Sequence, residues 1–141
     1  MNATIRWVDN KLFVAQSGSG HSLVVDGPPD LGGQNMGVRP MEMILMGLGA
    51  CTSVDVVDIL KKSRQPITDC VTQLTAERAE GVPSVFTRIH VHFVVTGRGL
   101  KHAAVARAVD LSATKYCSAS ILLGRAGVEL SHDFEIVEAG Q

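Results

Sequence analysis

Apolar and polar side chains alternate most clearly in segment 86–96, as expected for a strand with one buried face. The apolar positions on that face are Ile89, Val91, Phe93 and Val95. Shorter strand-like runs bounded by turn residues predict five further strands, at Thr4–Val8, Leu12–Gln16, Ser22–Val25, Thr68–Glu80 and Gly127–Val137. Segment 26–39 holds four glycines and two prolines, so it is expected to be a long loop.

Helical patterns separate these strands. Pro40 opens a helix that runs to about Ser63, and apolar residues cover nearly its whole circumference, which is typical of a core helix. Gly47 and Gly49 lower its helix propensity and are expected to permit close packing against another helix. The spacing of apolar residues predicts a second helix over Leu100–Tyr116, and a further turn or two over Cys117–Leu123.

This order of elements predicts an α+β fold in which a mostly antiparallel sheet packs on two helices. A chain of 141 residues suits one domain, so 1–141 is interpreted as a single domain.

Charge and composition narrow the classes of function. The net charge is −1 and the chain has no basic block, so neither nucleic acid nor an anionic membrane is expected as a partner. The first residues form no apolar run of the signal-peptide type, and nowhere do eighteen apolar residues stand together. A cytoplasmic location is the simplest expectation.

Three cysteines carry the candidate chemistry. Their odd, sparse number argues against a secreted disulfide scaffold and leaves two roles, inert packing or reactivity. Cys51 and Cys117 each lie on an apolar helix beside small residues, which would allow the helices to approach and the two sulfurs to meet. Cys70 lies in a predicted strand with no recognisable motif, and we expect it to be unreactive.

Two motifs surround Cys51 and Cys117. In PMEMILMGLGACTSVDVV a cysteine stands eleven residues after the opening proline, and KYCSAS holds the second cysteine. These segments resemble the central helix and the second cysteine motif of the OsmC/Ohr family, and most closely its YhfA-like branch. The order of elements and the spacing between the cysteines are also similar, so the resemblance covers nearly the whole chain.

The resemblance implies a thiol-dependent peroxidase that reduces organic hydroperoxides in the oxidative stress response. Cys51 would attack the peroxide and become a sulfenic acid, and Cys117 would resolve it as a disulfide. An external dithiol would then reduce the disulfide by exchange. The resemblance also implies an intertwined homodimer with its sites at the subunit interface, and no metal, flavin or haem.

The chain departs from the peroxidase pattern near the reactive cysteine. In the peroxidases, a carboxylate ten residues before that cysteine pairs with an arginine from the early strands. Here Met41 stands at the carboxylate position and Glu42 follows it, so Glu42 is the candidate carboxylate. Arg39 is the candidate arginine, with Arg6 and His21 as the alternatives.

Two other carboxylates bear on the acidity of Cys51. Asp55 and Asp58 lie four and seven residues after it, on the same helical face. Nearby negative charge opposes the ionisation of a thiol unless another group offsets it.

Two other hypotheses remain open, and a metal site is a third possibility to consider. A cysteine hydrolase would combine Cys51 with His21 or His102. A dimer without catalytic activity would sense redox state or bind apolar ligands through the same fold. His90 and His92 share one strand face, but no third ligand has suitable spacing, so a metal site is not expected.

Overall fold

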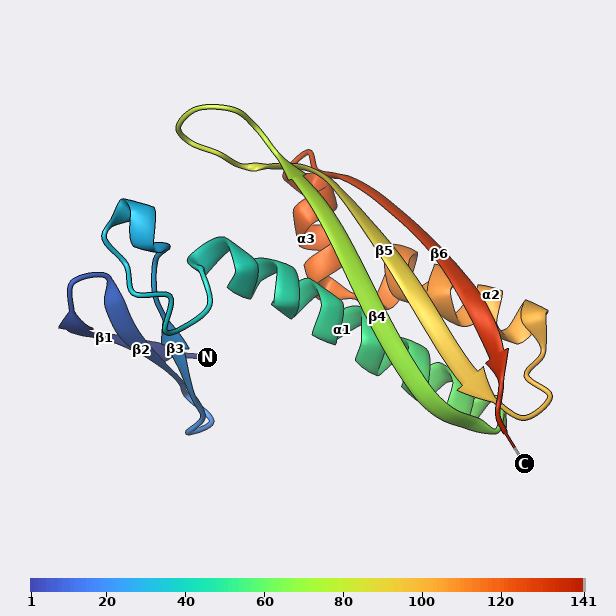
Figure 1. The fold of residues 1–141 in the computed structure, drawn as a ribbon. Helices are drawn as coiled ribbons and strands as arrows, with labels where there is room; N and C mark the ends of the chain where they lie inside the picture. Colours follow the sequence, from blue (N-terminus) through green and yellow to red (C-terminus); the bar gives the residue numbers. More distant parts are fainter. Residues whose placement is uncertain (141) are drawn as a thin grey trace. The chain divides into compact units, whose positions relative to one another are not determined.

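The computed structural model describes residues 1–140, which form two compact units (Figure 1). The first unit comprises Met1–Ile44, and the second begins at Leu45. The chain is a mixed α+β protein with two three-stranded sheets. The interpretation of residues 1–141 as a single domain stays a prediction.

The first unit contains the sheet β1-β2-β3, formed by β1 (Ala3–Asp9), β2 (Leu12–Ser17) and β3 (Ser22–Val25). Both strand pairs are antiparallel, as tight turns between consecutive strands require. Asn10 adopts a positive φ of 45° in the first turn, a conformation that asparagine tolerates better than most residues. The three predicted N-terminal strands are therefore confirmed.

The glycine-rich loop after β3 is organised by Asp26, whose side chain is buried. Its carboxylate accepts the backbone N–H groups of Gly27, Gln34 and Met36 at 2.7, 3.1 and 3.1 Å. Desolvation opposes ionisation, but these three N–H groups and the charge of Arg39 outweigh it and lower the pKa of Asp26. The loop thus has a fixed shape, with one short 3₁₀ turn, η1 (Pro29–Leu31).

The second unit contains the sheet β4-β5-β6, formed by β4 (Ile67–Arg78), β5 (Phe86–Gly97) and β6 (Glu129–Glu138). β4 pairs antiparallel with β5, whereas β6 lies parallel to β5. The prediction of a single sheet was wrong, because the N-terminal and C-terminal strands form separate sheets within the chain. The parallel pair arises because the connection from β5 to β6 passes through helices, which return the chain to the end where β5 begins.

The helices lie on one face of the β4-β5-β6 sheet (Figure 1). They are α1 (Pro40–Lys62), which begins in the first unit, α2 (His102–Leu111) and α3 (Ser118–Arg125). The helix predicted over Leu100–Tyr116 is shorter than expected. At its C-terminal end the backbone widens into a π-helical turn, η2 (Ser112–Tyr116), closed by a 2.8 Å hydrogen bond from the N–H of Cys117 to the carbonyl of Ser112.

The core of the second unit lies between this sheet and the helices. Its buried apolar side chains come from α1, β5 and α2: Leu48, Val56, Leu60, Ile89, Val91, Phe93, Val95, Val105 and Val109. The face predicted from the alternation in segment 86–96 is therefore confirmed. Burial of this side of α1 accounts for only part of its apolar character. Among the helices of residues 1–140, α1 is also the one that is long and apolar enough to cross a membrane, judged by length and composition alone.

The two glycines of α1 differ in their surroundings. A Cβ atom at Gly49 would lie 2.7 Å from Cδ1 of Leu74 on β4, whereas a Cβ at Gly47 would meet nothing within 4 Å. The expectation of helix–helix packing at these glycines was therefore wrong: Gly49 lets the helix approach a strand. The expectation that α1 is buried all round is also not met within one chain, since Met46 and Val54 are exposed.

Candidate functional site

Two of the three cysteines come together in the second unit. Cys51 lies about three turns into α1 and is partly exposed, whereas Cys117 lies between η2 and α3 and is fully buried. Cys51 lies close enough to Cys117 for its thiol to raise the pKa of Cys117, and both are free thiols. The structure thus brings together the cysteines of the two sequence motifs.

The surroundings of Cys117 favour its protonated form. Burial raises the pKa of this thiol, and the neighbouring Cys51 thiol raises it further. Ser120 acts in the opposite direction, since its backbone N–H donates to Sγ of Cys117 at 3.4 Å at the start of α3. The net shift of the pKa is upward, so the helix N-terminus does not make Cys117 an acidic thiol.

A buried hydroxyl network links the segments that carry the two cysteines. Ser112, the first residue of η2, lies with its Oγ 2.8 Å from Oγ1 of Thr52 and 3.0 Å from Oδ2 of Asp55. Thr52 directly follows Cys51 on α1, and the carbonyl of Ser112 accepts the N–H of Cys117.

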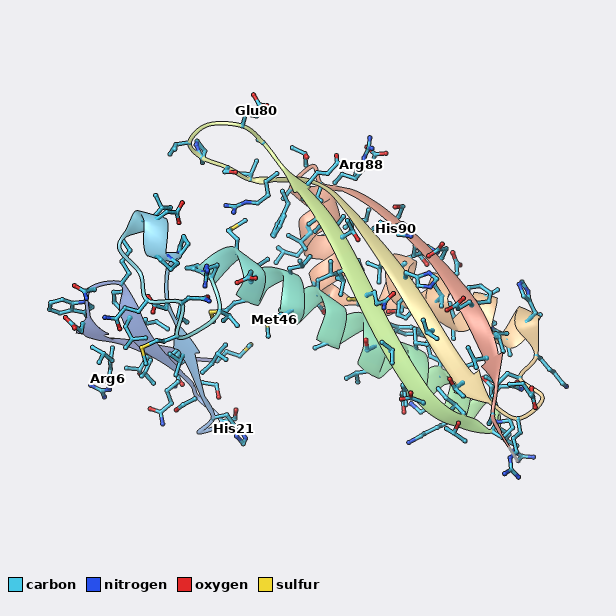
Figure 2. The ribbon with its side chains drawn as sticks, in the orientation of Figure 1. Arg6, His21, Met46, Glu80, Arg88 and His90 are labelled. Carbon is cyan, nitrogen blue, oxygen red and sulfur yellow. The ribbon has the colours of Figure 1, made fainter. Side chains whose placement is uncertain are left out.

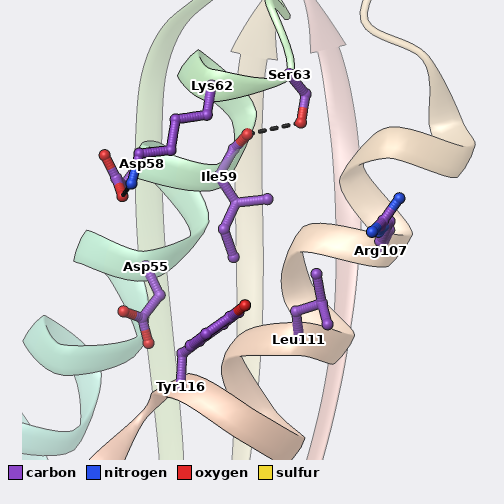
Figure 3. A pocket seen from close by; sticks show the side chains of 8 residues that line it. All are labelled: Asp55, Asp58, Ile59, Lys62, Ser63, Arg107, Leu111 and Tyr116. Atoms are coloured by element: carbon purple, nitrogen blue, oxygen red, sulfur yellow. Dashed lines mark hydrogen bonds and ion pairs between the residues drawn. The ribbon is translucent and has the colours of Figure 1, made fainter.

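A cavity of about 500 Å³ lies between α1 and the α2–η2 segment (Figure 3). Its lining combines charged, apolar and hydroxyl groups: Asp55, Asp58, Ile59, Lys62, Ser63, Arg107, Leu111 and Tyr116. Lys62 donates to Asp58 at 2.7 Å, which partly neutralises the acidic wall. Asp55 is one turn after Cys51 and Tyr116 directly precedes Cys117, so the cavity borders both cysteine-bearing segments.

The predicted activating residues, Arg39 and Glu42, belong to the first unit, where each has local partners. Oε1 of Glu42 accepts the backbone N–H of Arg39 at 2.8 Å, which caps the first turn of α1. The guanidinium of Arg39 donates to Oδ1 of Asn35 at 2.9 Å and to the carbonyl of Gly37 at 3.1 Å. These contacts give both residues a structural role, and a role at Cys51 stays a prediction.

Cys70 lies on β4, outside the two cysteine motifs in the sequence. Burial raises the pKa of this thiol, and the charge of Asp69 also raises it, against a lowering by the Thr72 hydroxyl. The net shift of the pKa is upward, which disfavours a thiolate, and the lack of reactivity at Cys70 stays a prediction.

The two strand histidines do share one exposed face, as predicted, with His90 projecting from β5 in Figure 2. Both interact with one carboxylate oxygen of Asp133 on β6, His90 at 2.9 Å and His92 at 2.7 Å. Nδ1 of His90 lies 2.7 Å from the hydroxyl of Ser131. Among residues 1–140, no three or more His, Cys, Asp or Glu side chains are grouped so as to hold a metal ion.

The residues named for other hypotheses lie in separate places. Arg6 and His21 belong to the first unit, on β1 and in the turn before β3 (Figure 2). His102 begins α2, where its ring packs against Phe134 with the centroids 5.0 Å apart. Within the described part of the second unit, no hydrogen bond joins His102 to Cys51, as the cysteine-hydrolase hypothesis would require.

Comparison with known proteins identifies the fold. The family model described as OsmC-like protein matches residues 32–133, which is more than half of the chain. The chain belongs to the OsmC-like family. Protein YhfA of Escherichia coli is 49% identical over 142 aligned residues, which cover 99% of this chain and all of that protein.

Solved structures agree with this assignment. A hypothetical protein from Aquifex aeolicus is 27% identical, with a TM-score of 0.85 over 99% of this OsmC-like chain and 97% of its own. The organic hydroperoxide resistance protein OhrB of Bacillus subtilis is 19% identical, with a TM-score of 0.62 and coverage of 95% and 96%. At that identity, OhrB shows only that the OsmC-like fold is shared.

Ser112, Thr52 and Tyr116 were not predicted from the sequence to lie at the site. A weak signal existed, because hydroxyl residues stand next to both cysteine motifs on helices that are otherwise apolar. Their convergence depends on a contact between positions 60 residues apart, which no local pattern records.

Proposed function

We propose that this OsmC-like protein is a thiol peroxidase that reduces organic hydroperoxides through Cys51 and Cys117. It acts in the oxidative stress response in the cytoplasm, as an intertwined homodimer, and an external dithiol returns it to the reduced state. The chemistry needs no metal or organic cofactor.

The observation that carries this proposal is the adjacency of two thiols with unequal exposure. Cys51 is partly exposed and therefore open to a peroxide, whereas Cys117 is buried beside it with a raised pKa. The accessible thiol attacks the peroxide, and the shielded, protonated thiol then reacts with the resulting sulfenic acid.

The reaction balances with these two residues and two substrates. The Cys51 thiolate attacks one peroxide oxygen, the O–O bond breaks, and the alcohol leaves after taking up a proton. Cys51 is now a sulfenic acid. The sulfur of Cys117 then attacks the Cys51 sulfur and forms the disulfide, and the sulfenic oxygen leaves as water with the Cys117 proton. Two electrons and two protons from a dithiol restore both thiols.

Arg39 and Glu42 are proposed to assist Cys51 within the dimer, as the family resemblance implies. An arginine beside the attacking thiol stabilises its thiolate, and a carboxylate paired with that arginine holds it in place. Arg6 and His21 are the alternatives for the cationic group.

The test is peptide mass spectrometry after one equivalent of cumene hydroperoxide. Cys51→Ser should abolish hydroperoxide consumption and leave Cys117 a free thiol. Cys117→Ser should react once and trap a sulfenic acid on Cys51, which excess peroxide converts to sulfinic acid. Cys70→Ala is the matched control and should keep turnover within a few-fold of the parent protein.

Oxidised sulfur found on Cys117 with Cys51 still reduced would reverse the two roles. If none of the variants oxidises faster than a free thiol, the peroxidase proposal fails. A redox sensor of the same fold is then favoured by the local partners of Arg39 and Glu42 and by the raised pKa of Cys117. Intact mass with and without a dithiol separates the two, because a sensor oxidises once and does not turn over.

A further inference from the structure

The side chain of Ser112 lies where the two cysteine-bearing segments meet. It is fully buried, and it contacts α1 at Thr52 and Asp55, one and four residues after Cys51. Its own backbone carbonyl holds the N–H of Cys117 at 2.8 Å. One residue therefore contacts both segments.

The acceptors within reach of the Ser112 hydroxyl set the direction of these hydrogen bonds; the carbonyl of Thr52, at 3.4 Å, is the more distant one. A serine hydroxyl carries one proton, and the carboxylate of Asp55 is the strongest acceptor in reach, at 3.0 Å. Oγ of Ser112 is then free to accept the hydroxyl proton of Thr52, at 2.8 Å. The result is a directed chain from Thr52 through Ser112 to Asp55, in which each bond strengthens the next.

We propose that Ser112 is a positioning residue, which with Thr52 and Asp55 holds Cys117 at disulfide-forming distance from Cys51. This inference deepens the proposed function and rests on it. The hydroxyl chain fixes η2 against α1, and the backbone bond of Ser112 transmits that position to Cys117. Ser112 itself takes part in no bond-making step.

Disulfide formation is sensitive to such positioning. The bond requires an S–S length of about 2.05 Å and a Cα–Cα separation of about 4.4–6.8 Å. In the peroxide reaction, capture by Cys117 competes with a second peroxide that oxidises the sulfenic acid of Cys51 to a sulfinic acid. If Cys117 is misplaced, disulfide formation is slower and more of Cys51 is oxidised to sulfinic acid.

The first test avoids peroxide, so that it stands apart from the proposed function. In a Cys70→Ala background, diamide, an azo oxidant, takes two electrons and two protons from Cys51 and Cys117 and leaves the disulfide and a hydrazine. Ser112→Ala and Thr52→Val should each slow closure of this disulfide by about tenfold, the scale of one lost hydrogen bond in a charge-assisted chain. Thr52→Ser keeps the hydroxyl and should close at nearly the parent rate.

Ser53→Ala is the matched control. The hydroxyl of Ser53 lies on the same helix, two residues from Cys51, and bonds equally well, to the carbonyl of Gly49 and the hydroxyl of Thr72, both at 2.6 Å. It links α1 to β4 rather than to the Cys117 segment. Its loss should lower thermal stability without slowing the disulfide by more than about twofold.

The second test measures the products formed with cumene hydroperoxide. Relative to the parent protein, Ser112→Ala and Thr52→Val should raise the ratio of sulfinic acid to disulfide at Cys51 by about tenfold. Thr52→Ser should keep nearly the parent ratio. Parent-like closure with diamide in both variants, or equal slowing in Ser53→Ala, would overturn the inference. If the two variants close the disulfide slowly with diamide but no protein reacts with the peroxide, the positioning role is retained and the peroxidase proposal is rejected.

Discussion

The packing of α1 on β4 can be tested with a pair of glycines in the same helix. Gly47 and Gly49 both lie in the turn before Cys51, yet an added Cβ would meet nothing at Gly47 and would lie 2.7 Å from Cδ1 of Leu74 at Gly49. We predict that Gly47→Ala stabilises the protein and that Gly49→Ala does not.

The magnitudes follow from two opposing effects. Replacing a helical glycine with alanine gains about 1 kcal/mol of helix propensity, and Gly47→Ala should show nearly all of it. At Gly49 the same gain meets a clash, because Leu74 must retreat by 0.7 Å (3.4 − 2.7 Å) to restore ordinary contact. Overpacking of this kind costs about 1–3 kcal/mol, so Gly49→Ala should be neutral or destabilising by up to about 2 kcal/mol.

Urea and thermal unfolding of the reduced protein measure the difference. The two variants should differ by at least about 1 kcal/mol in free energy of unfolding, or roughly 3 °C or more in Tm for a chain of this size. If Gly49→Ala stabilises as much as Gly47→Ala, then Leu74 moves at no cost and Gly49 is not needed for close approach. If both variants destabilise, the open space inferred at Gly47 is wrong.

Two further predictions concern charge and assembly. The hydrogen bond to Asp133 raises the pKa of His92, so this contribution to stability is present below about pH 6.5 and is lost as the pH rises through the raised value. His92 in turn lowers the pKa of Asp133, and the contribution of Asp133 to stability is lost as the pH falls through that lowered value. In urea unfolding from pH 3 to 9, Asp133→Asn should remove both of these changes of stability with pH. An unchanged pH profile would contradict this. In light scattering at micromolar concentration, we predict a species of twice the 15.0 kDa chain mass, because Met46 and Val54 leave one side of α1 apolar and exposed. Val54→Glu should shift it to monomer, and a monomeric parent protein would refute the dimer.

Most elements of the fold were predictable because their signals are local. The strand predicted at Phe86–Thr96 is observed as Phe86–Gly97, and the face that alternation predicted to be buried is the buried one. Pairing was not predictable in the same way. The pattern of β6 gives its period but not its partner, so its parallel alignment with β5 became visible only in the structure.

The end of α2 shows another limit of local patterns. The apolar spacing that predicted one helix to Tyr116 ends at Leu111, and beyond it the N–H of Cys117 bonds to the carbonyl five residues back. The choice of that carbonyl is coupled to the contacts of Ser112 with Thr52 and Asp55 on another helix. A tertiary contact thus accompanies a local change that places the second cysteine at the start of α3.

The sequence predicted which cysteines come together, but not the contacts of the residues expected to activate them. Small residues and two motifs predicted that Cys51 and Cys117 could meet, and the Cys51 thiol lies close enough to raise the pKa of Cys117. Glu42 follows the family's carboxylate position by one residue and Arg39 is a nearby arginine, so the sequence predicted both at the site, whereas in the first unit they bond to their own loop and helix end.

In the peroxidase that we propose, burial and positioning would act together at Cys117. Burial raises the pKa of Cys117, which reduces its thiolate fraction at neutral pH and by itself would make it a slow resolving thiol. Holding two reacting groups in a productive arrangement can raise their effective concentration to about 10⁵ M or more, which can offset that loss. Under this proposal the resolving step should therefore depend more on where η2 holds Cys117 than on how acidic its thiol is. For the same reason a hydroxyl such as that of Ser112, which touches neither sulfur in the proposed reaction, would control whether Cys51 ends as a disulfide or as a sulfinic acid.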